Sequence, residues 1–271
     1  MTPVLLGWLL GCAEEVLPPP PPGMPPPPLG VAWFTSADGA RWERQPGYAH
    51  DGLQSLGLRV GPAGALEVCG LNFRGRAAWW ERFTGPPLHG ATFDGAAWSP
   101  TTWSVSDPET TNYIDPQWLD DELWYIARAG THGDPALDGG SNRVRSSPPP
   151  QDRLALAGAT DPSPVRFAGQ LHLFLTTGGR RVEHWAGEPL ARVATWDEVT
   201  VPFATVIADE LWLVAQRATP PRTPVVSRST DGRSWSPFVP VVETARACTS
   251  PVVGPHPRGG LVLLCVEESA P

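Results

Sequence analysis

The stretch Ser229-Thr230-Asp231-Gly232-Arg233-Ser234-Trp235 decides how the chain folds, because its pattern occurs three times. The other copies are Ser36-Ala37-Asp38-Gly39-Ala40-Arg41-Trp42 and Thr92-Phe93-Asp94-Gly95-Ala96-Ala97-Trp98. In such a segment the Asp side chain bonds to turn amides, the Gly adopts a positive φ, and the Trp packs between neighbouring sheets. Three copies of one tight turn predict a repeated β architecture.

A second repeat, of two apolar strands joined by a polar turn, predicts the remaining strands. Its second strand carries an apolar anchor, and successive anchors lie 48, 40 and 50 residues apart. These anchors are Leu123, Leu171, Leu211 and Leu261. Repeats of about 40 to 50 residues with four strands each are typical of propeller blades. A more divergent copy begins at Asp51-Gly52-Leu53 and brings the number of blades to five.

The two ends of the chain complement each other in this repeat. The last inner hairpin, residues 250–267, has no outer strands after it. The first turn, after residues 31–34, has no inner hairpin before it. We therefore expect an all-β, five-bladed β-propeller closed by N- and C-terminal strands that share one blade, which removes open sheet edges. The shared blade is called blade 1 here, and blades 2 to 5 begin near residues 51, 115, 161 and 201.

The amino-acid composition disfavours a helical fold, a nucleic-acid partner and a metal site. The 271 residues include 34 Pro and 28 Gly, which disfavours long helices. All 20 basic residues are Arg, the net charge is −8 and no basic run occurs, so a nucleic-acid partner is not expected. No Cys-x-x-Cys or Cys/His pattern suggests zinc, and the spacing of His132, Asp134 and Asp138 is unspecific. We expect neither a metal nor another cofactor.

The N-terminal sequence predicts where the protein is located in the cell. Residues 4–10 form an apolar run that is too short to span a bilayer. The run leads into Leu9-Leu10-Gly11-Cys12, which resembles a bacterial lipobox, and the proline tracts 18–22 and 25–28 then form an extended tether. Met1-Thr2-Pro3 departs from the signal pattern because it carries no Arg or Lys, so either the start codon lies upstream or the match is fortuitous.

These features predict three segments and one compartment. We expect a signal over residues 1–12 with lipidation at Cys12, a tether over 13–30 and the propeller over 31–271, held at the bacterial cell envelope by the lipid alone. Cys69, Cys248 and Cys265 then remain in an oxidising compartment. Cys248 and Cys265 flank a hairpin turn and can face each other, which would leave Cys69 as a buried thiol.

The repeated turns and the blade count carry a family resemblance. The turns resemble the Asp-box of sialidase-type (BNR) propellers. Asp115-Pro116 and Asp161-Pro162, at inner-strand starts of a five-bladed ring, resemble the family 43 glycosidases of the arabinanase and xylosidase type. The likeness covers residues 31–268 and implies a fold, which does not by itself fix a function.

The resemblance to family 43 implies a set of catalytic carboxylates. Asp51, Asp115 and Asp161 begin the inner strands of three consecutive blades, where that family places its general base and its pKa modulator. Paired carboxylates differ in pKa, so that one protonates the leaving oxygen while another activates water. The family's Glu-Gly-Pro acid motif has no match, because blade 5 reads Val201-Pro202.

Two glutamates are the candidates to replace this acid, and a structural role for the aspartates stays open. Ser250-Pro251 in blade 1 also lacks the acid, so Glu183 in blade 4 and Glu243 before blade 1 are the possible substitutes. In the alternative interpretation, each Asp-Pro only caps its own inner strand, since Asp bonds to nearby amides and Pro opens a strand comfortably.

Arginines in the loops between second and third strands predict a cationic mouth suited to a carboxylate or sulfate. They are Arg74, Arg76, Arg128, Arg180, Arg181, Arg217 and Arg222. Tyr48 and Tyr113 lie in blade-to-blade connections on the same side. The sialidases that this set resembles use three arginines and a Tyr nucleophile with its Glu, but their Arg-Ile-Pro motif is absent here. Solvated loop arginines are the alternative.

The sequence therefore predicts a monomeric lipoprotein whose propeller binds an extracellular carbohydrate or an anionic small ligand. A glycoside hydrolase that uses the inner-strand aspartates is the first alternative. A scaffold that docks a protein partner in a surface complex is the second. An open pocket with paired carboxylates would favour hydrolysis, and a flat apolar face would favour the scaffold.

Overall fold

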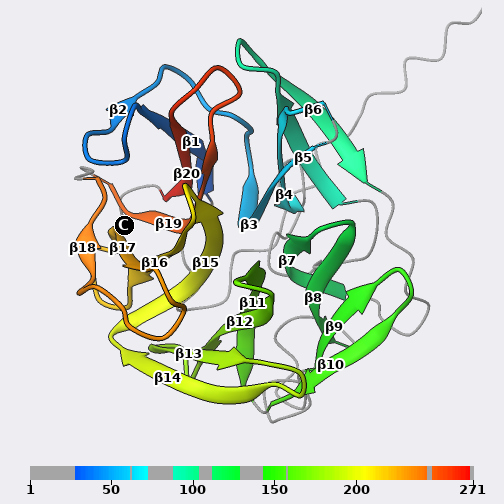
Figure 1. Ribbon diagram of the computed structural model, residues 1–271. Coiled ribbons are helices and arrows are strands. Elements are labelled where there is room, and N and C mark those ends of the chain that lie inside the picture. The colour runs from blue at the N-terminus through cyan, green and yellow to red at the C-terminus, as the bar shows by residue number, and fades with distance from the viewer. Residues whose placement is uncertain are drawn as a thin grey trace, which may run out of the picture.

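The computed structural model describes residues 28–61, 63–72, 88–103, 112–128, 143–156, 158–242 and 246–268. Within these ranges the chain forms strands and turns, and no helix. Five sheets of four strands each are arranged around a centre (Figure 1). The prediction of an all-β, five-bladed β-propeller is confirmed. The described residues contain no helix that is long and apolar enough to cross a membrane.

Blades 1 to 3 each run from an inner to an outer strand. Blade 1 consists of β19 (Cys248–Pro255), β20 (Leu261–Glu268), β1 (Pro28–Ser36) and β2 (Glu43–Arg44). Blade 2 consists of β3 (Leu53–Val60), β4 (Leu66–Asn72), β5 (Leu88–Phe93) and β6 (Trp98–Trp103). Blade 3 consists of β7 (Asn112–Leu119), β8 (Glu122–Arg128), β9 (Arg143–Ser147) and β10 (Gln151–Ala155).

Blades 4 and 5 complete the ring. Blade 4 consists of β11 (Ala159–Phe167), β12 (Gln170–Thr177), β13 (Arg181–Ala186) and β14 (Ala191–Asp197). Blade 5 consists of β15 (Val199–Ile207), β16 (Glu210–Arg217), β17 (Pro224–Ser229) and β18 (Val239–Pro240). Each of the inner strands β3, β7, β11, β15 and β19 contacts the inner strands of both neighbouring blades, so the ring is continuous.

The ring closes where the two ends of the described chain meet. Strand β20 pairs antiparallel with β1, from Val31 opposite Val266 to Ser36 opposite Leu261, as the sequence predicts. Strand β1 begins at Pro28, so the propeller takes in residues that the sequence assigns to the tether. The predicted disulfide joins Cys248 to Cys265 across β19 and β20.

The third cysteine of the propeller is a buried thiol, as expected from the pairing of the other two. Cys69 lies on β4 with no exposed surface. Burial disfavours the thiolate and raises the pKa of this thiol to about 12, so Cys69 is protonated and unreactive at neutral pH.

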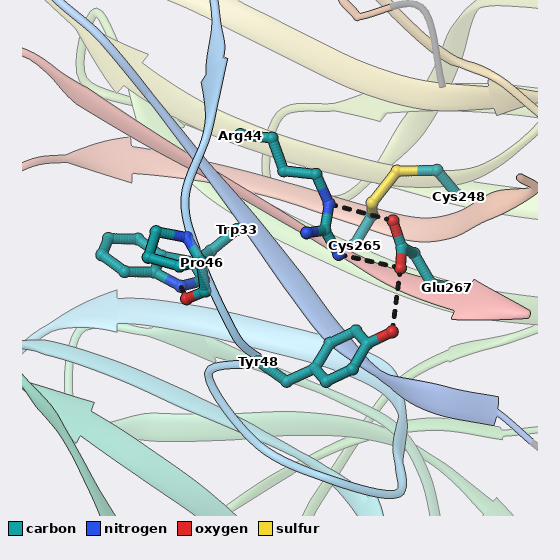
Figure 2. Close-up of polar contacts among 7 residues, drawn as sticks. All are labelled: Trp33, Arg44, Pro46, Tyr48, Cys248, Cys265 and Glu267. Carbon is teal, nitrogen blue, oxygen red and sulfur yellow. Dashed lines mark hydrogen bonds and ion pairs between the residues drawn. A yellow bond between two sulfur atoms is a disulfide. The ribbon is translucent and has the colours of Figure 1, made fainter. Parts of the chain in front are cut away.

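A buried carboxylate clamps the closing blade (Figure 2). Glu267, on β20, keeps 7% of its side chain exposed. Arg44 donates to both of its oxygens, from Nε at 3.3 Å and from Nη2 at 3.0 Å. Tyr48 donates its hydroxyl to Oε2 of the same carboxylate at 3.1 Å. The Tyr48 ring lies directly over Gly30, where a Cβ would come within 2.7 Å of it. The clamp therefore joins the N-terminal outer segment to the C-terminal strand.

The three Asp-Gly turns have the hydrogen bonds that the sequence predicts. Asp231 Oδ1 accepts bonds from the amides of Arg233 and Ser234, each at 2.7 Å, and Gly232 donates its N–H to Ser229 Oγ at 2.8 Å. Asp38 and Asp94 accept the corresponding turn amides. These backbone bonds lower the pKa of all three aspartates, since they stabilise the charged form.

The turn at Asp231 packs against the neighbouring blade. Gly232 has φ +71°, and a Cβ at this position would come within 2.7 Å of His172 Cε1 on β12. Trp235 lies 5.6 Å from Phe174 and 5.8 Å from His184, ring centre to ring centre. The predicted packing of the Trp between adjacent sheets is thus confirmed in blade 5, and the Gly is needed for both its φ and its size.

The same interface contains two buried histidines in contact. His172 Nδ1 and His184 Nε2 are 2.8 Å apart, and one proton between them satisfies both atoms. Burial lowers the pKa of both rings, to about 3 for His184, so both are neutral at physiological pH. The interface between blades 4 and 5 therefore contains no buried charge at this point.

Removing the arginine of the clamp tests how far the closure of blade 1 stabilises the fold. We expect Arg44→Ala to lower the free energy of unfolding by about 2 kcal/mol, because Glu267 stays buried without its cation. The figure is below that for a fully buried pair because Arg44 is itself 43% exposed. Urea denaturation measures the loss.

Arg180→Ala is the matched control for this variant. Its pair with Glu198 is exposed on both sides, so its loss should cost less than about 1 kcal/mol. Equal losses in the two variants would contradict a stabilising role for the clamp.

Candidate functional site

Each inner strand has an irregular register at the same point, close to its first residue. The irregularities lie between Gln54 and Gly57 and at the equivalent points of the other four blades. One residue in each has a φ near +50°, and these residues are Ser55, Asp115, Asp161, Val201 and Ser250. Such bulges bend a strand and re-aim side chains. The five bulge residues therefore surround one end of the ring, which we call the mouth.

Side chains of one blade hold the bulge amide of the next. Asp161 N–H donates to Asp115 Oδ2 at 3.0 Å. Val201 N–H donates to Thr176 Oγ1 at 2.8 Å, and Ser250 N–H donates to Gln216 Oε1 at 2.9 Å. Bulging takes these amides out of the regular ladder, and an unpaired buried N–H is costly. The three contacts, called latches below, therefore tie blades 3, 4, 5 and 1 together at the mouth.

The first latch brings two predicted catalytic residues together. Asp115 is 7% exposed, and its carboxylate lies against the backbone of Asp161 in the next blade. Thr160 donates its hydroxyl to Asp161 Oδ2 at 2.9 Å. Asp115 thus bonds to an amide of the following blade, in addition to any capping of its own strand. Both carboxylates belong to equivalent positions of adjacent inner strands.

The structure corrects the register of Asp51. This residue precedes β3 (Leu53–Val60), and the position equivalent to Asp115 and Asp161 is occupied by Ser55. The Asp-Gly of residues 51–52 resembles the other inner-strand starts in sequence, but blade 2 has no proline after its bulge residue to mark the register. Asp51 lies near the mouth end of β3, and its predicted catalytic role stays a prediction.

Glu183 lies away from the aspartates, on the third strand of blade 4. Trp185 Nε1 donates to its Oε2 at 3.1 Å, and Arg192 Nη1 donates to its Oε1 at 3.2 Å. Strand β12 separates β13 from the inner strand, a displacement of about 10 Å over two strand spacings. Both oxygens of Glu183 therefore serve contacts within blade 4. Glu243, the other proposed substitute for the acid, lies outside the described residues.

The described arginines of the second-to-third-strand loops are mostly paired with carboxylates. Arg181 Nε bonds to Asp197 at 2.8 Å, which raises the pKa of this arginine further, and Arg180 pairs with Glu198. Arg222 lies 3.6 Å from Glu268. Arg217, on β16, has no ion pair with any residue in the described part of the chain. These pairs reduce the positive charge that the sequence predicts at the mouth.

The other predicted site residues fall where the structure gives no side chain. Tyr113 on β7 and Arg128 on β8 are described in their backbone alone. Arg74, Arg76 and Cys12 lie outside the described residues. Over the described ranges, no three His, Cys, Asp or Glu side chains are grouped so that they could hold a metal ion.

Sequence reasoning missed the latch side chains of blades 4 and 5 and the clamp. Thr176 and Gln216 occupy the mouth ends of the second strands β12 and β16, where the sequence shows only an alternating apolar pattern. Tyr48 and Glu267 are 219 residues apart. An alignment of the blade repeats would have placed Thr176 and Gln216 at the same position, the end of the second strand. No local signal predicts the pairing of Tyr48 with Glu267.

Comparisons with known proteins bear on the fold. No family model and no curated protein matches the chain. Among solved structures, it is similar to an exo-β-1,3-galactanase from Phanerochaete chrysosporium with bound galactose, with a TM-score of 0.53 and 12% identity. The match covers 85% of this chain and 64% of the galactanase, so the chain spans less than two thirds of that enzyme.

Two further structures are similar over most of their own length. A thermostable family-43 glycoside hydrolase matches with a TM-score of 0.52 and 8% identity, over 80% of this chain and 88% of the other. An endo-arabinase from Bacteroides thetaiotaomicron matches with a TM-score of 0.51 and 12% identity, over 88% and 98%. At these identities the likeness shows the fold alone, a five-bladed β-propeller that resembles those of family 43 glycoside hydrolases.

Two substitutions at Asp115 separate its latch from its charge. Asp115→Asn retains an oxygen that can accept the Asp161 amide, so we expect the free energy of unfolding to stay within about 0.5 kcal/mol of the wild-type value. Asp115→Ala removes the acceptor and should cost about 1–2 kcal/mol. Chemical denaturation checks both.

Thr176→Val is the matched control in a latch that has no carboxylate, and it should cost about 1 kcal/mol. Equal stability of the Asn and Ala variants at position 115 would show that the latch contributes nothing.

Proposed function

We propose that the propeller is a glycoside hydrolase that acts on a carbohydrate at its mouth, with Asp115 and Asp161 as the carboxylate pair. One observation carries this proposal: Asp115 Oδ2 accepts the Asp161 amide at 3.0 Å, which ties the two aspartates together at equivalent positions of adjacent blades. The fold gives further support, because the solved structures to which it is similar are glycoside hydrolases.

The chemistry of glycoside hydrolysis fits two such groups. One carboxylic acid protonates the glycosidic oxygen as the bond to the anomeric carbon breaks, and the other carboxylate takes a proton from the water that attacks this carbon. Asp115 is held in place by the Asp161 amide and is 7% exposed, which suits a carboxylate of fixed orientation. Asp161 is more exposed and suits the group that exchanges a proton with the sugar oxygen.

Carbohydrate binding without hydrolysis is the second candidate, and a specific observation favours it. The other three bulge positions at the mouth carry Ser55, Val201 and Ser250, so none of these positions adds a carboxylate to the pair. In this case the mouth holds a glycan or an anionic ligand. The aspartates contribute hydrogen-bond acceptors, and Arg217, which has no ion pair within the described ranges, contributes donors.

Hydrolysis is tested with a panel of nitrophenyl arabinofuranosides, xylosides and galactosides and with the corresponding polysaccharides. We expect turnover of at least one substrate, and a loss of about 100-fold or more in kcat for both Asp115→Asn and Asp161→Asn, because each removes one ionisable group. Asp209→Asn, in the β15–β16 turn at the opposite end of the ring, is the matched control and should retain full activity.

Three outcomes separate the candidates. Saturable binding of a glycan without turnover would favour the binding function. Turnover that survives both substitutions at the mouth would place the active site elsewhere. Neither binding nor turnover of any glycan in the panel would argue against both.

We also propose that Cys12 carries a lipid that anchors the protein to the bacterial envelope. Support comes from the sequence: the apolar run 4–10, the Leu-Leu-Gly-Cys match and the proline tether that follows. Metabolic labelling with palmitate should mark the wild-type protein in the membrane fraction of a bacterial host. Cys12→Ser should abolish the label and release the protein from that fraction. An unlabelled wild-type protein would contradict the anchor.

A further inference from the structure

A pocket of about 640 Å³ lies on the face of the propeller opposite the mouth. It is formed where the Asp-Gly turns of blades 1 and 2 meet the β19–β20 turn. Its end at the β19–β20 turn lies one strand length, about 25 Å, from the mouth end of β19, and its Trp33, on β1, is two strands outside β19. Its volume falls within the range of about 300–1,000 Å³ that small-ligand pockets have.

An aromatic ring of fixed orientation forms the apolar part of this pocket. Trp33, on β1, is partly exposed and lines the pocket. Its ring lies edge-to-face against Phe93 at 5.2 Å and against Trp98 at 6.0 Å, centre to centre. Its Nε1 donates to the carbonyl of Pro46 at 3.4 Å (Figure 2). Because these contacts are made within the protein, the ring needs no reordering when a ligand binds.

Polar side chains of β2 and of the residues on either side of it line the same pocket. Gln45 donates its amide N–H groups to Thr35 Oγ1 at 2.8 Å and to the Glu43 carbonyl at 3.2 Å, which fixes the amide plane and leaves Oε1 as an acceptor. Arg41 offers donors and Glu43 offers acceptors. Neither of these two exposed side chains forms an ion pair with any residue in the described ranges.

The charge of the pocket narrows the ligand class. Among the lining side chains, Asp38 and Glu43 bring two negative charges against the one positive charge of Arg41. Arg258 lies against Gly95 at the edge of the pocket, where its charge is offset by that of Asp94. His256 adds none, because burial lowers its pKa and its Nδ1 accepts the Arg258 amide at 3.0 Å. A phosphate, sulfate or carboxylate ligand is therefore disfavoured. A neutral ligand with several hydroxyl groups fits, because each hydroxyl both donates and accepts.

We propose that this pocket is a second carbohydrate-binding site, which takes a neutral saccharide with an apolar face on Trp33 and its hydroxyls on Arg41, Glu43 and Gln45. The proposal does not depend on the function of the mouth, since the two sites share no residue. With both sites, the protein can hold a polysaccharide in this pocket whether or not the mouth is occupied.

The test measures binding of maltotriose, cellotriose, xylotriose and galactotriose by titration calorimetry and by saturation-transfer NMR. We expect at least one trisaccharide to bind with a Kd of about 1 mM or better. Arg41→Ala and Gln45→Ala should each weaken this binding about fivefold or more, the equivalent of about one hydrogen bond. Arg41 is exposed and Gln45 is half-buried, and circular dichroism checks that the fold is intact in both variants.

Arg233→Ala is the matched control, because Arg233 is an exposed arginine in the equivalent turn of blade 5. It should leave the affinity unchanged. Trisaccharide binding that is identical in wild type, Arg41→Ala and Gln45→Ala would place the sugar elsewhere and overturn the proposal. No binding of any trisaccharide at about 10 mM would also overturn it. Choline is titrated as a cationic probe. Binding of choline without binding of any trisaccharide would show that the pocket takes a cation, and would also overturn the proposal.

Discussion

The antiparallel pairing of β20 with β1 is the interaction on which the rest of the structure depends. It completes blade 1 from strands at opposite ends of the propeller sequence, and without it the ring would have two open edges. The carboxylate clamp secures this pairing, and a disulfide fixes β20 to its inner neighbour β19. Only the clamp bridges the two ends of the propeller sequence, because the disulfide lies within the β19–β20 hairpin.

The geometry of the mouth follows from this closed ring. Five inner strands that touch in a circle must each begin beside the next, and every inner strand has its bulge at that point. In blades 4, 5 and 1 the amide that the bulge releases from the ladder is held by the preceding blade, which supplies an aspartate, a threonine or a glutamine. Asp115 therefore has two roles in our account, because it holds the ring together and forms part of the proposed carboxylate pair. Because Asp115 has both roles, Asp115→Asn tests the charge while it keeps the hydrogen bond, whereas Asp115→Ala removes both together.

Much of the fold could be predicted from the sequence, because short local motifs that recur along the chain determine the strands and turns. The Asp-Gly turns, the 40 to 50-residue spacing and the unmatched ends predicted the blades, their number and their closure. The disulfide between Cys248 and Cys265 followed from a single hairpin. The site was less predictable. In blade 2 the bulge position is occupied by Ser55. The sequence could not show this, because Asp51-Gly52 resembles the start of the other inner strands and suggests a different register. The partners of Glu183, Arg181 and Arg222 are other side chains whose proximity arises only after folding.

The most direct measurement is a crystal structure of the protein soaked with an oligosaccharide that it binds or cleaves, which reports where the sugar ring lies relative to Asp115 and Asp161. We expect a sugar at the mouth, with an anomeric carbon between two carboxyl groups about 5 to 9.5 Å apart, the range that glycosidases use. A mouth filled by protein side chains, with both aspartates bonded only to the backbone and no sugar beside them, would contradict it.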